Sequence, residues 1–231
     1  MRLSISHRFT LSIDTIRDAV RHTATSLSKN LPEGAKINVW FTGHSLGTAL
    51  ASLVYARAIN EQHEFGPNVV LRDAYLFATP ILADVPSVRA FHNRLNHDSR
   101  RTMWRITNGL DAVATALPDF GDNSSIVLSP YNLFSFAHLG MELTLRKGPG
   151  KSVVCGNAFA HGTIVRIESA VGPPPAPVHA PNSVGDADEE AMETLRRLEG
   201  IPILGRLVAH APARYWDMLQ NVQLGECEWQ D

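Results

Sequence analysis

The sequence has no long apolar run, no dense basic cluster and only two cysteines. No stretch approaches the roughly 18–20 consecutive apolar residues that cross a bilayer. Residues 1–15 lack the continuous apolar segment of a secretory signal. A formal net charge of −2 supplies no long-range attraction for nucleic acid. These absences predict a protein with no transmembrane segment and no nucleic-acid partner.

Cysteine and glycine usage gives no sign of a bound cofactor. Cys155 and Cys227 lack metal-ligand spacing, and they fit either a disulfide in an oxidising compartment or two reduced thiols. There is no internal repeat and no phosphate-binding glycine loop. We therefore expect no metal and no organic cofactor. A cytoplasmic location is expected if Met1 is the true start, and secretion if an upstream segment is missing.

The composition that remains is that of an ordinary globular protein. The 231 residues are 44 % hydrophobic and 19 % charged, which predicts one α/β domain over residues 1–231. Partial alternation over 2–9 predicts a short strand, and apolar spacing over 12–31 predicts a helix. Strands are then expected at 37–41, 68–77 and 102–107, with helices from 48 onward and over 85–95.

Strands that alternate with helices predict a mostly parallel sheet flanked by helices and joined by right-handed crossovers. Runs at 139–146 and 151–155 surround a Gly-Pro-Gly turn and predict an antiparallel hairpin at the edge of that sheet. Residues 171–185 predict an exposed proline-rich loop. Asp186 is expected to cap a helix that reaches Glu199, and a last helix is expected over 213–219.

The most informative stretch is the predicted strand that begins at Ile37, followed by Gly43-His44-Ser45-Leu46-Gly47 and a helix. A strand, G-x-S-x-G and a helix together form a nucleophile elbow. So sharp a turn predicts a positive φ at Ser45, and a Cβ at either flanking glycine is expected to collide across it. The N–H of Leu46, at the start of the helix, is the expected oxyanion donor.

A nucleophilic serine needs a histidine base and a carboxylate that orients it. Asp111 follows the strand expected at 102–107, at the sheet edge where catalytic groups gather, although a solvated turn aspartate has the same position. The other aspartates considered are Asp73, Asp84, Asp119 and Asp122. Four histidines follow Asp111: His138, His161, His179 and His210. From sequence order alone, His210 is the leading candidate, and a capping or core role remains open for it.

Several segments resemble the class 3 (fungal-type) lipases, which have the α/β-hydrolase fold. The elbow FTGHSLGTALASL is similar to the family's GHSLGGALA, with Thr48 at a frequent glycine position. AYLFATPILAD (74–84) resembles the family's next strand, which runs into a proline. RITNGLDAVATALP (105–118) resembles the segment that carries the triad acid, and HAPARYW (210–216) resembles that of the late histidine. The resemblance spans about residues 5–220 and implies that Asp111 is the acid and His210 the base.

The resemblance also implies a departure from the family. The segment Ser6–Phe9 is similar to one that follows the family's first sheet strands, its lid and its first oxyanion donor. Those features are therefore expected to be missing from this sequence, and the resemblance implies an N-terminal truncation relative to the family. Loss of one oxyanion donor lowers the rate on the order of 10²–10³-fold.

The function expected is that of a serine carboxylic ester hydrolase, a lipase or esterase that acts on lipid-type or small esters through Ser45, Asp111 and His210. Transient contact with a lipid interface is part of this expectation. The alternative is a truncated, non-catalytic homologue that binds lipid or a protein partner through its exposed sheet edge. Covalent labelling by a fluorophosphonate probe discriminates between the two.

Overall fold

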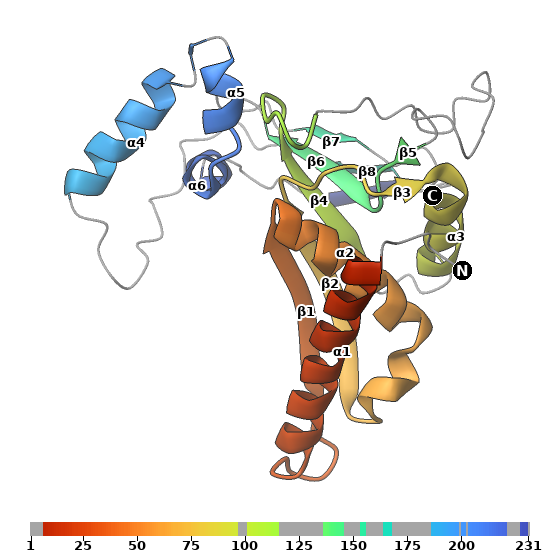
Figure 1. Ribbon diagram of the computed structural model, residues 1–231. Helices are drawn as coiled ribbons and strands as arrows, with labels where there is room; N and C mark the ends of the chain where they lie inside the picture. The colour runs from red at the N-terminus through yellow and green to blue at the C-terminus, as the bar shows by residue number, and fades with distance from the viewer. Residues whose placement is uncertain are drawn as a thin grey trace.

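Figure 1 shows the fold of the chain as a computed structural model. It describes residues 7–96, 101–115, 136–145, 153–155, 164–167, 186–198, 200–201, 203–220 and 227–230. The predicted loop at 171–185 lies outside these residues.

A five-stranded sheet in the order β1-β2-β4-β6-β7 organises the chain. Its strands are β1 (Ile37–His44), β2 (Val69–Phe77), β4 (Met103–Asn108), β6 (Met141–Leu145) and β7 (Val153–Cys155). The first four are mutually parallel, and β7 pairs with β6 in the antiparallel sense. The predicted parallel sheet with an antiparallel edge hairpin is therefore confirmed. Because parallel strands share a direction, their carboxyl ends meet at one edge of the sheet.

One face of the sheet is covered by α1 (His7–Ser28) and α2 (Leu46–Asn60), which lie together in front of β1 and β2 in Figure 1. The helix α2 is apolar on most sides, and its buried residues pack on both strands. Ile13 and Ala24 of α1 join the same core, together with Leu53 of α2 and Leu71 and Leu76 of β2. This core holds β1, which leads into Ser45, against α2, which follows Ser45.

The opposite face is covered near its carboxyl edge by α6 (Pro212–Gln220). Phe77 and Ile106 are paired across β2 and β4, and both pack in one cluster with Tyr215 and Met218 of α6. The last helix therefore lies against the edge where β1 and β4 end.

The remaining described elements are short or peripheral. They are η1 (Gln62–Phe65), β3 (Ala83–Asp84), α3 (Val85–Asn96), β5 (Phe136–Ala137), β8 (Ile164–Ile167), α4 (Asp186–Leu198), α5 (Leu204–Val208) and β9 (Cys227–Gln230). β3 pairs with β5, and β8 pairs with β9, as two small antiparallel sheets. Cys155 and Cys227 lie on strands of different sheets.

Several boundary predictions were wrong. The strand expected over 37–41 extends to His44, and the helix expected over 12–31 ends at Ser28. The strand expected over 2–9 is contradicted at its carboxyl end, because His7–Phe9 form the first turn of α1, while residues 1–6 lie outside the described part. The apolar residues Ile13, Ile16 and Val20 recur at helical spacing, and the helix they anchor extends back over the weak alternation. Asp186 is the first residue of α4 and not its cap.

Candidate active site

Ser45 lies in the turn between β1 and α2 with φ 55° and ψ −126°. A positive φ in a residue with a Cβ is strained and persists only where its surroundings enforce it. The Ser45 N–H donates to Phe77 O at 3.0 Å, and its carbonyl accepts from Thr48 N–H at 2.9 Å. The predicted positive φ is therefore confirmed, and the turn is held by bonds to β2 and to α2.

The two glycines of the elbow have different structural roles. A Cβ on Gly43 would stand 2.8 Å from the Gly47 carbonyl carbon, so the turn closes only without one. A Cβ on Gly47 would meet nothing within 4 Å. The predicted collision is confirmed for Gly43 and wrong for Gly47, because the first turn of α2 directs the Gly47 Cβ position toward open space.

The turn between α5 and α6 brings His210 to the serine. Its Nε2 lies 2.8 Å from Ser45 Oγ, although the two residues are 165 positions apart in the chain. Its Nδ1 lies 3.0 Å from each carboxylate oxygen of Asp111. A carboxylate only accepts, so Nδ1 carries the hydrogen and Nε2 of the neutral ring is left to accept from the serine hydroxyl. The structure thus joins the three predicted residues in one hydrogen-bonded chain.

Asp111 follows β4 and is fully buried, with 0 % of its surface exposed. Its Oδ1 accepts from the N–H groups of Val113 at 2.7 Å and Ala114 at 3.3 Å. Its Oδ2 accepts from the Tyr215 hydroxyl at 2.6 Å. A buried carboxylate is tolerated when its lone pairs are all engaged, and here both oxygens also face His210.

Tyr215 is a site residue to which sequence reasoning assigned no role. Its buried hydroxyl donates to Asp111 and accepts from the Asn108 N–H at 3.0 Å. Burial raises the pKa of this hydroxyl far above its usual range, so it stays protonated and remains a donor. The available signal was the tyrosine five positions after His210, whose partner cannot be inferred from spacing.

Further bonds tie the turn of the acid to the turn of the base. Asn108 Nδ2 donates to Ala209 O at 3.1 Å, directly before His210. The N–H of Ala112 donates to Arg206 O at 3.1 Å. Because these bonds span about a hundred residues of sequence, the relative position of the acid and the base depends on tertiary contacts.

The other two elbow residues lie beside the serine. Leu46 is the first residue of α2, and its side chain is 62 % exposed. The N–H groups of a first helical turn have no partner within the helix, so this amide is available to a ligand at Ser45. His44, at the end of β1, contacts the His210 backbone through Nε2 at 2.8 Å.

The competing residues have other surroundings. Asp73 accepts from the Thr102 N–H at 2.9 Å, and Asp84 accepts from the Ser87 N–H at 2.8 Å at the start of α3. His138 is buried, and burial lowers its pKa to about 2. The candidates outside the described residues are Asp119, Asp122, His161 and His179.

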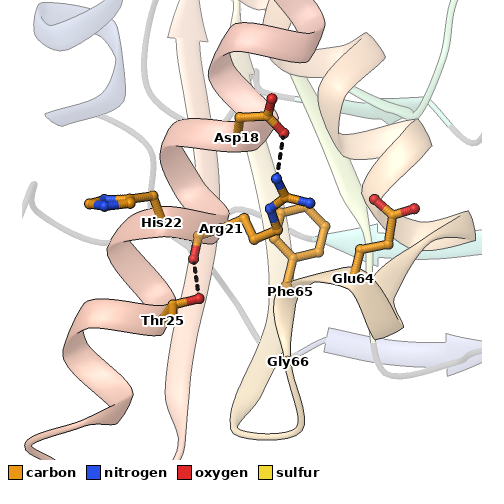
Figure 2. Close-up of a pocket in the computed structure, with 7 residues that line it drawn as sticks. All are labelled: Asp18, Arg21, His22, Thr25, Glu64, Phe65 and Gly66. Atoms are coloured by element: carbon orange, nitrogen blue, oxygen red, sulfur yellow. Dashed lines mark hydrogen bonds and ion pairs between the residues drawn. The ribbon is translucent and has the colours of Figure 1, made fainter.

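A hollow of about 410 Å³ opens away from these residues, between α1 and η1 (Figure 2). Asp18, Arg21 and Thr25 of α1 line it opposite Glu64 and Phe65 of η1. It lies near the amino end of β2, whereas Ser45 and Asp111 follow the carboxyl ends of β1 and β4. Arg21, the arginine in its lining, is paired with Asp18 at 3.4 Å. The hollow therefore adds nothing to the site.

The residues that the structure describes contain no group of three or more His, Cys, Asp or Glu side chains that could hold a metal ion. Within the same ranges, no helix has the length and apolar character to cross a membrane.

Two solved lipase structures are similar to parts of this chain. The chain resembles lipase II from Rhizopus niveus, with 18 % identity and a TM-score of 0.43, over 64 % of this chain and 48 % of that one. It also resembles M37 lipase, with 25 % identity and a TM-score of 0.32, over 44 % of this chain and 28 % of that one. The chain thus spans about half the length of the first lipase and less of the second.

The sequence profile of the family described as Lipase (class 3) matches residues 3–120. That match covers half of the chain and includes the elbow, the strand that follows it and the loop with Asp111. The chain therefore belongs to the class 3 lipase family.

Proposed function

We propose that this protein is a serine carboxylic ester hydrolase, a lipase or esterase with Ser45 as nucleophile, His210 as base and Asp111 as orienting acid. The observation that carries the proposal is the hydrogen-bonded chain from Ser45 Oγ through both ring nitrogens of His210 to a fully buried carboxylate. This is the arrangement that activates a serine hydroxyl, recognised by geometry and not by sequence position.

In the proposed reaction, Ser45 Oγ bonds to the ester carbonyl carbon while its proton passes to His210 Nε2. The carbonyl electron pair moves onto oxygen and forms a tetrahedral oxyanion. When the carbonyl re-forms, the bond to the alkoxy oxygen breaks, and the departing alcohol takes the proton from Nε2. Water then repeats the sequence on the acyl-serine, which releases the carboxylic acid and restores Ser45.

Asp111 and its partners act on the protonation of the base. The carboxylate fixes the hydrogen on Nδ1, leaves Nε2 free to accept, and stabilises the imidazolium that forms during each half-reaction. The Tyr215 hydroxyl and the two backbone N–H groups hold the carboxylate in place. The Leu46 N–H is the proposed oxyanion donor at the start of α2.

The surroundings of the three residues support an apolar ester as substrate. Leu46 adjoins Ser45, Leu110 adjoins Asp111, and Leu207 lies one helical turn before His210. All three side chains are exposed. Exposed leucines beside each member of the site offer apolar contacts to an acyl chain or to a lipid surface. We propose lipid-type or small esters as substrates, with transient contact at a lipid interface.

The test is hydrolysis of p-nitrophenyl butyrate and palmitate by the wild type and by Ser45→Ala. We expect release of nitrophenol by the wild type and a loss of at least about 10³-fold in the variant, because the nucleophile is removed. A fluorophosphonate probe should label the wild type alone. Equal activity of the two proteins would contradict the proposal.

A second candidate function is binding without catalysis, and one observation favours it. β1 lies at the end of the sheet order, and the bonds of Ile37 and Ser45 to β2 place the odd-numbered residues toward that strand. Asn38, Trp40 and Thr42 therefore direct their backbone N–H and C=O groups away from β2, toward the side of β1 on which no described strand lies. An open edge of this kind can accept a partner strand. A folded protein that neither hydrolyses esters nor reacts with the probe would favour this function.

A further inference from the structure

His44 contacts the proposed base in two ways. Its Nε2 lies 2.8 Å from the backbone carbonyl oxygen of His210. Its ring centroid lies 4.7 Å from that of His210 at an interplanar angle of 45°, and 5.8 Å from that of Tyr215, nearly edge-on. A carbonyl only accepts, so Nε2 of His44 carries a hydrogen and donates it.

These contacts join the base to the strand of the nucleophile. His210 lies in a short turn between α5 and α6. The carbonyl of the preceding residue, Ala209, accepts a hydrogen bond from Asn108 Nδ2. That bond attaches the turn to β4, which precedes Asp111. His44 attaches the next carbonyl to β1, one residue before Ser45. The base is therefore tied independently to the strand of its acid and to the strand of its nucleophile.

We propose that His44 is a positioning residue, which sets the distance between His210 Nε2 and Ser45 Oγ by donating its own Nε2–H to the His210 carbonyl. The inference rests on the proposed esterase function. The second residue of the G-H-S-L-G turn would then position the base, in addition to forming part of the elbow. A displacement of about 1 Å between reacting groups costs on the order of 10²-fold in rate.

The charge state of His44 is compatible with this task. Burial lowers the pKa of His44, and the neighbouring His210 lowers it further when charged, while the bond to the His210 carbonyl and the Asp111 carboxylate act in the opposite direction. The lowered pKa favours the neutral form of His44, which limits charge repulsion between the two tilted rings when His210 carries the transferred proton.

Two substitutions separate the donor from the ring. His44→Phe keeps an aromatic ring and loses the donor, whereas His44→Gln keeps a donor at a similar reach and loses the ring. We expect His44→Phe to lower kcat for p-nitrophenyl butyrate by about 10–100-fold with KM within about twofold, and His44→Gln to recover most of the loss. His63→Phe, at an exposed histidine of η1, is the matched control with wild-type kcat.

Wild-type kcat in His44→Phe would overturn the inference, and so would equal impairment of the Phe and Gln variants. A second measurement is independent of ester hydrolysis: the NMR titration of the His44 ring in the wild type and in His210→Gln. We expect the pKa of His44 to rise in His210→Gln, because the neighbouring positive charge is removed while the carbonyl remains. An unchanged His44 titration would overturn the close approach of the two rings, on which the inference rests. An inactive wild type in which His44 responds to His210→Gln would overturn the proposed function alone.

Discussion

Strain and close approach at single residues shape the elbow. Ser45 has a positive φ, and Gly43 leaves no room for a Cβ because the Gly47 carbonyl carbon occupies that space. The pattern G-x-S-x-G contains two glycines, but the structure shows a steric need for only the first. The two positions can therefore be separated by experiment.

Gly43→Ala should destabilise the fold by about 1–3 kcal/mol and lower ester hydrolysis, because the new methyl group displaces the turn that holds Ser45. Gly47→Ala is the control. Its methyl group meets open space within α2, so it should be neutral or stabilising by up to about 1 kcal/mol. Urea unfolding measures both changes, and equal stability of the two variants would contradict this steric assignment.

Tyr215→Phe should also affect both stability and rate. The change removes the hydroxyl that bonds Asp111 and leaves the Asn108 N–H buried without that acceptor. A lost partner of this kind costs about 1–3 kcal/mol. We expect lower stability in urea and a lower kcat, because the acid is less well held. Tyr75→Phe is the control, since that hydroxyl makes a 3.3 Å exposed bond to Asp73. Similar results for the two variants would argue against a role for Tyr215.

At the scale of elements, α3 is joined to the turn before β6 by a buried histidine. His92 Nε2 accepts from the Gly140 N–H at 3.1 Å, which requires a ring nitrogen without a hydrogen. Burial, with a smaller contribution from Arg105, lowers the pKa of His92 to about 4. The unfolded chain binds a proton at this histidine near pH 6.5, so acid favours unfolding between the two values.

The free energy of unfolding should therefore fall as the pH drops from 7 to 5. The loss attributable to His92 is about 2 kcal/mol at pH 5, since each pH unit below 6.5 costs about 1.4 kcal/mol. A glutamine does not titrate in this pH range, so His92→Gln should reduce the loss of unfolding free energy by about 2 kcal/mol. The control is His63→Gln, at an exposed histidine, which should leave the loss unchanged. Urea titrations at the two pH values measure the difference. An unchanged pH dependence in His92→Gln would contradict the assignment.

The predicted bounds of helices and strands agree closely with the observed bounds where the apolar pattern of the sequence is strong. The expected bounds of β2, α3 and β4 differ from the observed ones by one residue at most. The prediction failed at His7–Phe9, where a weak alternation of period two competed with the helical period of the residues that follow. Packing of α1 against α2 decided between them, because only the helix carries its apolar residues into the core.

At the scale of the whole molecule, the outer edge of β1 is the feature with the clearest consequence. The strand contains no charged residue and no proline, and Trp40 is 57 % exposed upon it. The irregular pairing between β1 and β2 places the extra residue on β2, so β1 itself stays regular. Regular, uncharged edges pair readily with other strands.

Self-association of the chain should therefore depend on this edge. We expect sedimentation velocity to show association that grows with protein concentration, and Trp40→Lys to suppress it by placing a charge on the strand. Leu27→Lys is the control, because Leu27 is similarly exposed but lies on α1. Equal association of the two variants would exclude the β1 edge as its cause.

The sequence alone determined the elbow and the mostly parallel pairing of the sheet, because both depend on neighbours in the chain. A strand, a turn and a helix need only local periodicity and glycine placement, and alternating strands and helices imply parallel pairing. Sequence order also reduced the candidates for the acid and the base to a few. The tertiary structure decided which of them meet Ser45, since the contacts to His210, Tyr215 and His44 each span about a hundred residues or more. Such contacts arise from the packing of α6 on the sheet, which no local pattern encodes.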